Sequence, residues 1–126
     1  MRKACSIAVG LALGAAGAAV SSAGSSAAAC PHDLLAPTAN PIGPAVTAAL
    51  VADSPKNRPQ VVGATVAPHD TQRGPQAKAR CGTKVWRRTV VVYIVDRAFL
   101  PAQSASQRVL FVGRTHAGYR VWERAH

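Results

Sequence analysis

The aromatic residues and the prolines of this chain are separated along its length, and this separation limits what each part can fold into. All six aromatic residues lie in residues 78–126, whereas eight of the nine prolines lie in residues 30–77. Proline lacks a backbone N–H and interrupts regular hydrogen bonding, and a segment without aromatic residues has little large apolar surface to bury. The sequence therefore predicts a Pro/Ala-rich, largely irregular arm at residues 30–77, followed by a small folded domain at residues 78–126.

Residues 1–29 have the three regions of a secretory signal peptide. Arg2 and Lys3 precede an uncharged apolar stretch, and a run of small residues ends at Ala29. The apolar stretch is shorter than the roughly 20 residues that a membrane-spanning helix needs. We therefore expect cleavage before residue 30, or alternatively after Ala23, and a secreted chain without a transmembrane span.

Two cysteines, Cys30 and Cys81, remain after removal of the leader, because Cys5 lies within it. An even number of cysteines in an oxidising compartment indicates a disulfide between them. The alternative is lipidation of Cys30, because the two alanines before it resemble the end of a lipoprotein signal. A lipidated Cys30 cannot also form a disulfide, and the chain would then be anchored on the cell surface. Free thiols are the third possibility.

The segments that are rich in β-branched and aromatic residues predict the fold of the C-terminal domain. Valine and isoleucine occupy both alternating positions of residues 90–95, so we expect that strand to be covered on both faces. The arm adds only two short elements, a helix over residues 44–52 and a strand over residues 60–67. The predicted fold class is mainly β, a small antiparallel sheet whose three strands are residues 84–96, 107–115 and 119–125.

Gly118 allows the turn between the last two predicted strands to be specified. A three-residue loop over residues 116–118 would end in the left-handed conformation that glycine adopts without steric cost. That loop pairs Gly113 with Val121 and Val112 with Trp122, whereas a four-residue loop from Thr115 places Trp122 opposite Phe111. In the first register one face, predicted to be the core, carries Val109, Phe111, Tyr119 and Val121.

The positive charge of the chain is concentrated in the predicted domain. Ten basic residues in residues 78–126 face only Asp96 and Glu123, which gives a net charge of +8. Arginine binds phosphate and carboxylate groups through a planar fork and stacks on aromatic rings. We therefore expect an anionic wall polymer, polysaccharide or nucleic acid to bind there. The candidate anionic-ligand residues are Arg87, Arg88, Arg114, Arg120, Trp122 and Arg124.

The same charge has a second explanation that involves no ligand. Arginine exceeds lysine and alanine is abundant, which is typical of high-GC genomes, and the charge then serves only solubility. These features, together with the Ala-rich leader and the Pro/Ala-rich arm, are similar to those of secreted proteins of high-GC bacteria such as actinobacteria. The resemblance extends over residues 1–80 without any motif. It implies export from a bacterial cell, and no activity.

Patterns that indicate catalysis or metal binding are weak. The predicted domain has only two acids, Asp96 and Glu123, on different predicted strands, so we expect no carboxylate pair for acid–base catalysis. The histidines lack metal-ligand spacing, and no phosphate-binding glycine motif is present, so neither a metal nor a cofactor is expected. A non-enzymatic role is favoured. The alternative is a small secreted hydrolase of nuclease type, with Glu123 as the base and His116 or His126 as the acid.

Overall fold

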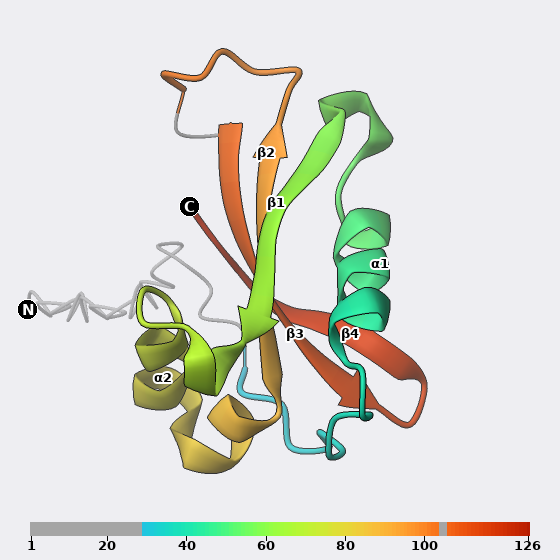
Figure 1. Cartoon of the computed structure of the whole chain (residues 1–126), viewed down its shortest axis with the longest axis vertical. Helices are drawn as coiled ribbons and strands as arrows, with labels where there is room; N and C mark the ends of the chain where they lie inside the picture. The colour runs from blue at the N-terminus through green and yellow to red at the C-terminus, as the bar shows by residue number, and fades with distance from the viewer. Residues whose placement is uncertain (1–28, 104–105) are drawn as a thin grey trace, which may run out of the picture.

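The computed structural model describes residues 29–103 and 106–126 (Figure 1). The predicted leader lies outside the described residues, except for Ala29. Within the described part, an antiparallel sheet has a helix on each face. In chain order the elements are α1 (Ile42–Ala52), the 3₁₀ turn η1 (Pro55–Asn57), β1 (Pro59–Val66), the 3₁₀ turn η2 (Ala67–His69), α2 (Gly74–Arg87), β2 (Thr89–Asp96), β3 (Gln107–Thr115) and β4 (Gly118–Ala125).

The four strands lie side by side in the order in which they occur in the chain, β1-β2-β3-β4. Strands β2 and β3 are the two middle strands. Val90, Val91 and Val92 of β2 are completely buried. Because successive side chains of a strand point to opposite faces, β2 is covered on both faces, as predicted. The prediction of a mainly β fold with an antiparallel sheet in the C-terminal half is confirmed.

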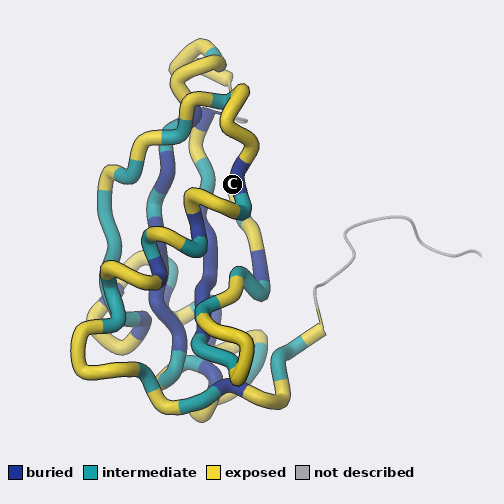
Figure 2. The backbone as a smooth tube through the Cα atoms, turned by 90° about the vertical axis from the view of Figure 1, so that its right-hand side faces the viewer, coloured by how far each residue is buried: buried dark blue, intermediate teal, exposed yellow. Residues whose placement is uncertain are grey.

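Helix α1 covers one face of the sheet. Its Ala45 and Ala49 are fully buried against Val90, Val92 and Ile94 of β2. These small side chains let the helix approach the branched side chains of the strand closely, as a dense core requires. Figure 2 shows that burial is concentrated along the middle of the sheet, while the outer turns of the chain remain exposed.

Helix α2 and the turn η2 cover the other face. Ala77 of α2 belongs to the same buried cluster as Phe111 of β3. The helix begins after Asp70, whose Oδ1 accepts hydrogen bonds from the backbone N–H groups of Gln72 and Arg73, at 2.8 Å each. These bonds, with a longer one of 3.4 Å from the N–H of Gly74, order the turn that leads into α2.

The strand predicted over residues 84–96 begins later than expected, at Thr89, because its first residues form the last turn of α2. Gly82 has a φ of 87° and kinks the helix, after which one further helical turn follows. The Thr89 hydroxyl donates to the Val85 carbonyl at 2.7 Å and closes this turn. The β propensity of Val85 and Trp86 amounts to about 1 kcal/mol or less each, which such local contacts can offset.

Residues 30–77 are less regular than the C-terminal half, as predicted, and the helix expected over residues 44–52 and the strand expected over residues 60–67 both exist, as α1 and β1. Strand β1 pairs with β2 and adds a fourth strand to the three that we predicted. The sheet itself supplies the large apolar surface, so the arm needs only small side chains such as Ala45 to pack on it.

The turn between β3 and β4 is one residue shorter than predicted. Residues 116–117 form a two-residue turn that joins Thr115 to Gly118. Gly118 has a φ of 104°, a conformation that residues with a side chain rarely adopt. Gly113 consequently pairs with Arg120 and Val112 with Val121, which is the register of the predicted four-residue loop and not that of the three-residue loop.

A β-bulge in β4 interrupts this register at Trp122. Val112 pairs with Val121 and Phe111 pairs with Glu123, so Trp122 is the extra residue of the bulged strand. Trp122 lies on the α2 side of the sheet, packed against Phe111. The register next to the turn splits the four residues expected on one core face, with Val109 and Phe111 on the α2 side and Tyr119 and Val121 on the α1 side.

Candidate anionic-ligand site at the sheet edge

Strand β4 is an edge strand of the sheet, and no strand of the described residues pairs with its outer side. A groove of about 720 Å³ lies between β4 and helix α1, and we call it the α1–β4 groove. The backbone of an edge strand presents unpaired N–H and C=O groups to a partner. Polar and charged groups of the groove come from Thr47, Tyr119, Arg120 and Arg124, and part of its apolar wall from Val51 and Ala52.

Two of the predicted ligand residues meet in the α1–β4 groove. Arg120 is exposed and lines it. Arg124 also lines it, and one of its guanidinium nitrogens donates to the Ala52 carbonyl at 3.1 Å. A cation at the C-terminal end of a helix interacts favourably with the helix dipole. Arg124 therefore holds the end of α1 and still presents donors to the groove.

Two further predicted arginines contact the N-terminal segment of the described chain. Arg88 donates to the Leu34 carbonyl, and Arg114 donates to the Ala36 carbonyl at 3.1 Å. The backbone N–H of Leu35 in turn donates to the Arg114 carbonyl at 2.7 Å. These arginines satisfy carbonyl groups of an irregular segment that has few other partners.

The remaining predicted residues lie elsewhere. Arg87 is exposed at the end of α2. Trp122 is half-buried on the α2 side, where its Nε1 donates to the Thr89 hydroxyl at 3.3 Å and its ring centre lies 5.4 Å from that of Phe111. A smaller hollow of about 370 Å³ adjoins Trp122, and Arg120 lines this hollow as well. The structure therefore divides the predicted residues between two sides of β4, and Arg120 borders both.

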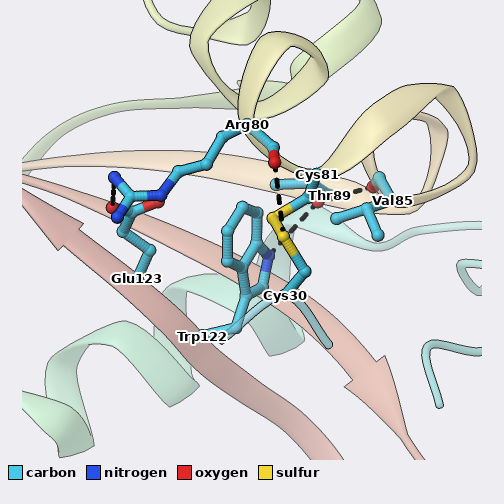
Figure 3. Close-up of a disulfide and its surroundings, with 7 residues drawn as sticks. All are labelled: Cys30, Arg80, Cys81, Val85, Thr89, Trp122 and Glu123. Carbon is cyan, nitrogen blue, oxygen red and sulfur yellow. Dashed lines mark hydrogen bonds and ion pairs between the residues drawn. A yellow bond between two sulfur atoms is a disulfide. The ribbon is translucent and has the colours of Figure 1, made fainter. Parts of the chain in front are cut away.

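The sulfur atoms of Cys30 and Cys81 lie 2.10 Å apart, and their Cα atoms lie 5.4 Å apart (Figure 3). This arrangement is compatible with the predicted disulfide. The bridge joins α2 to the segment before Leu34, whose buried side chain covers Gly113 of β3. The N-terminal segment thus closes over the sheet next to Trp122.

The residues of the hydrolase alternative are held in separate places. Glu123 is buried and forms an ion pair with Arg80 of α2 (Figure 3). His116 is exposed in the β3–β4 turn, and Nδ1 of His126 lies 3.3 Å from the Gln107 carbonyl. No hydrogen bond between described residues joins Glu123 to either histidine. The described residues also contain no group of three or more histidine, cysteine or acidic side chains placed to hold a metal ion.

The sequence analysis missed a pair of carboxyl groups. Asp96 is completely buried at the end of β2, and its Oδ2 lies 2.7 Å from Nε of Arg108. Asp53, which follows α1, lies 3.8 Å from the same arginine and accepts from the Ser54 N–H at 2.8 Å and from the Asn57 amide at 3.1 Å. The pair escaped the sequence analysis because Asp53 belongs to the predicted arm, and only the position of α1 brings it to the end of β2.

The two carboxyl groups differ in their pKa values. Burial, followed by the hydrogen bond and the negative charge of Asp53, raises the pKa of Asp96 to about 6. Burial also acts to raise the pKa of Asp53, but hydrogen bonds from Asp96, Asn57 and Ser54, with the Arg108 charge, outweigh it and leave that pKa below its ordinary value. Because the groups interact directly, they titrate as a pair, with one proton shared between them below about pH 6.

Comparison with protein-family models, with curated proteins and with solved structures found no match. In the described part of the chain, the helices are too short or too polar to cross a membrane. The function must therefore be argued from the geometry and the charge of this chain alone.

Proposed function

We propose that the chain is a secreted, non-enzymatic protein that binds an anionic polymer along the β4 edge. The observation that carries this proposal is the pair of arginines in the α1–β4 groove. Arg120 and Arg124 line a groove whose described lining contains no acidic residue. The formal net charge of +8 on residues 78–126 adds a long-range attraction for anions.

The groups of the groove suit sulfate, phosphate or carboxylate groups on a repeating chain. A guanidinium group donates two parallel hydrogen bonds to such groups. The open N–H groups of β4 add further donors along an extended ligand. Val51, four-fifths exposed on α1, offers an apolar contact for the backbone of a polymer. These contacts carry little information about sequence, so we expect binding that depends on charge and salt.

An explanation without a ligand predicts a different experimental result. Positive charges and a bulge on an edge strand prevent pairing with other sheets. Arg120, Arg124 and the bulge at Trp122 fit that role as well. Under this explanation, removal of the two arginines promotes self-association. It lowers the affinity for a polyanion no more than removal of any two other positive charges does.

Heparin, whose sulfate groups stay ionised, is a suitable probe. We expect the Arg120→Gln/Arg124→Gln variant to bind more weakly and the slope of log K against log salt to fall by about one to two. The matched control is Lys56→Gln/Lys84→Gln, which removes the same charge from two exposed residues outside the groove. Equal losses in the two variants, or elution of the wild type from heparin below physiological salt, would refute the proposal.

The hydrolase alternative has less support, because Glu123 is already paired with Arg80 and is buried. A general base must reach the proton that it removes. An assay on RNA homopolymers with Glu123→Gln as the control tests this alternative directly, since activity that disappears in the variant would establish it.

A further inference from the structure

Asp53, Asp96 and Arg108 form a buried cluster at one end of the sheet, and we call it the Asp–Asp–Arg cluster. Asp96 is completely buried, Asp53 is one-twentieth exposed, and the Arg108 side chain is one-quarter exposed. Arg108 lies 2.7 Å from Asp96 and 3.8 Å from Asp53. With one proton on the two carboxyl groups the cluster is neutral, and without it the cluster carries one net negative charge.

The unpartnered atoms of the cluster are accounted for by a shared proton. Oδ2 of Asp53 and both carboxyl oxygens of Asp96 are buried without a hydrogen-bond partner among the described residues, although Oδ2 of Asp96 forms the ion pair with Arg108. A proton between the carboxyl groups allows the hydrogen bond that joins them. A buried polar group without a partner costs free energy, and two negative charges in contact repel each other. Loss of the proton therefore weakens the contact between the groups.

The cluster is connected to the α1–β4 groove by a single peptide unit. Asp53 directly follows Ala52, the last residue of α1. Ala52 lines the groove, and its carbonyl accepts the hydrogen bond from Arg124. The backbone N–H of Asp53 donates to the Ala49 carbonyl and closes the last helical turn. A movement of Asp53 away from Asp96 therefore moves one wall of the groove and one of its two arginines.

We propose that the proton shared by Asp53 and Asp96 holds the end of α1 against the sheet, and that its loss loosens this end and weakens anion binding in the α1–β4 groove. This inference rests on the proposed function. It adds that anion binding in the groove depends on pH through a cluster that does not itself contact the ligand. In the form that binds well, the two carboxyl groups share one proton, and the positive charge of Arg108 balances the one negative charge that remains.

The charges of the neighbouring elements do not provide the same switch. Arg108 on β3 is the only charged group besides the two acids in the cluster contacts of the described residues. Lys56 and Arg58 lie in and after η1, and Arg97 follows β2. Arg58 and Arg97 donate to each other's backbone carbonyl groups. None of these three cations forms a hydrogen bond or an ion pair with the carboxyl groups of the cluster among the described residues.

The direction of the pH effect follows from the raised pKa. In the unfolded chain Asp96 ionises near pH 3.9, whereas in the folded chain it keeps its proton up to about pH 6. The contribution of the shared proton to stability is therefore complete below about pH 4 and is lost as the pH rises through about 6. We expect the end of α1 to be held firmly against the sheet at mildly acidic pH, and less firmly at neutral pH.

Heparin binding at about pH 5 and about pH 7.5 tests the inference, since the charge of the probe is constant over that range. We expect binding of the wild type to weaken at least about fivefold at the higher pH. Asp96→Asn keeps a donor for Asp53 without a titrating proton, so it should bind at both pH values as the wild type does at the lower one. This variant retains all four histidines, and its remaining pH dependence therefore measures their contribution.

The thermal midpoint of the protein without ligand separates the two proposals. It should fall for the wild type between about pH 5 and about pH 7.5 and stay constant for Asp96→Asn, or for Asp53→Asn if that first variant does not fold. A fall of equal size in wild type and variants overturns the inference. Equal pH dependence of heparin binding in wild type and variants also overturns it, while absence of heparin binding at both pH values refutes the proposed function instead.

Discussion

The side chain of Leu34 lies directly over Gly113, so that a Cβ atom at residue 113 would come within 2.5 Å of Leu34 Cδ2. Leu34 is buried although it belongs to the irregular N-terminal segment, and Gly113 is buried in the middle of β3. The missing side chain of Gly113 thus provides the space by which the N-terminal segment packs on the sheet. This contact, together with the disulfide, makes that segment part of the folded structure.

Gly113→Ala should therefore destabilise the protein by displacing Leu34. Overpacking of a dense core costs about 1–3 kcal/mol, and we expect a loss of unfolding free energy in that range by chemical denaturation. In a Leu34→Ala background the same substitution should cost less, because the clashing atoms are absent. Gly43→Ala in α1 is the matched control, since an added Cβ there meets no atom within 4 Å and alanine favours a helix. Equal effects of Gly113→Ala in both backgrounds would contradict the packing argument.

The Cys30–Cys81 bridge should stabilise mainly the N-terminal segment. The chain-entropy model gives roughly 4 kcal/mol for a loop of this length, but this figure assumes that the whole loop becomes free. We expect Cys30→Ser/Cys81→Ser to lower the melting temperature and to speed hydrogen exchange of the Leu35 amide, which donates to the Arg114 carbonyl. Amides of β2 should lose less protection. Free thiols in the folded, oxidised protein would show that the bridge does not form.

Trp122 should contribute more to stability than to ligand binding. It packs on Phe111, and its Nε1 donates to Thr89. Trp122→Ala should therefore cost about 2–4 kcal/mol of unfolding free energy, since it removes a large and partly buried ring. Trp122→Phe keeps much of the packing and should lose about 1 kcal/mol with the hydrogen bond. Unfolding followed by circular dichroism measures both, and a stable Trp122→Ala variant with weaker heparin binding would instead assign the ring to the ligand.

The strands were predictable from the sequence because their signal is local. In residues 90–95, branched side chains point to both faces of the strand. That pattern alone indicates a strand that is covered on both faces. The sequence could not decide between the two predicted registers of the last hairpin, and the bulge at Trp122 has no local signature. The turn residues fit two loop lengths equally well, and the packing of Trp122 on Phe111 is a tertiary contact.

The sequence predicted which types of residue the candidate site contains, but not how they are arranged. The excess of arginine identified Arg120 and Arg124, but the sequence did not show that Arg88 and Arg114 donate to backbone carbonyls of residues 34–36. Such carbonyls become acceptors only once the segment is placed on the sheet. The pairing of Asp53 with Asp96 depends likewise on the position of α1. Charges counted along a chain therefore indicate which ligand it attracts, and only the fold determines which of them remain available.

Asp70 should make the protein less stable in acid, and Tyr93 should make it less stable in alkali. The Tyr93 hydroxyl donates to Asp70 Oδ2 at 2.6 Å, while Asp70 Oδ1 accepts from backbone N–H groups of the turn before α2. Burial acts to raise the pKa of Asp70, but the Tyr93 hydrogen bond and these N–H groups outweigh it and hold that pKa below its ordinary value. Burial and the charge of Asp70 raise the pKa of Tyr93 above its ordinary value.

The stabilising effect of Asp70 should consequently be present above about pH 4 and be lost as the pH falls through its lowered pKa. The effect of Tyr93 should be present below about pH 10 and be lost as the pH rises further. At neutral pH we expect Asp70→Ala to cost about 1–2 kcal/mol through loss of its hydrogen bonds to Tyr93 and to backbone N–H groups, and Tyr93→Phe to cost about 1 kcal/mol. Because the residues share one hydrogen bond, the double variant should lose less than the two single losses combined. Additive losses in denaturant titrations, or an Asp70→Ala effect that stays constant down to about pH 2, would show that the pair does not act as described.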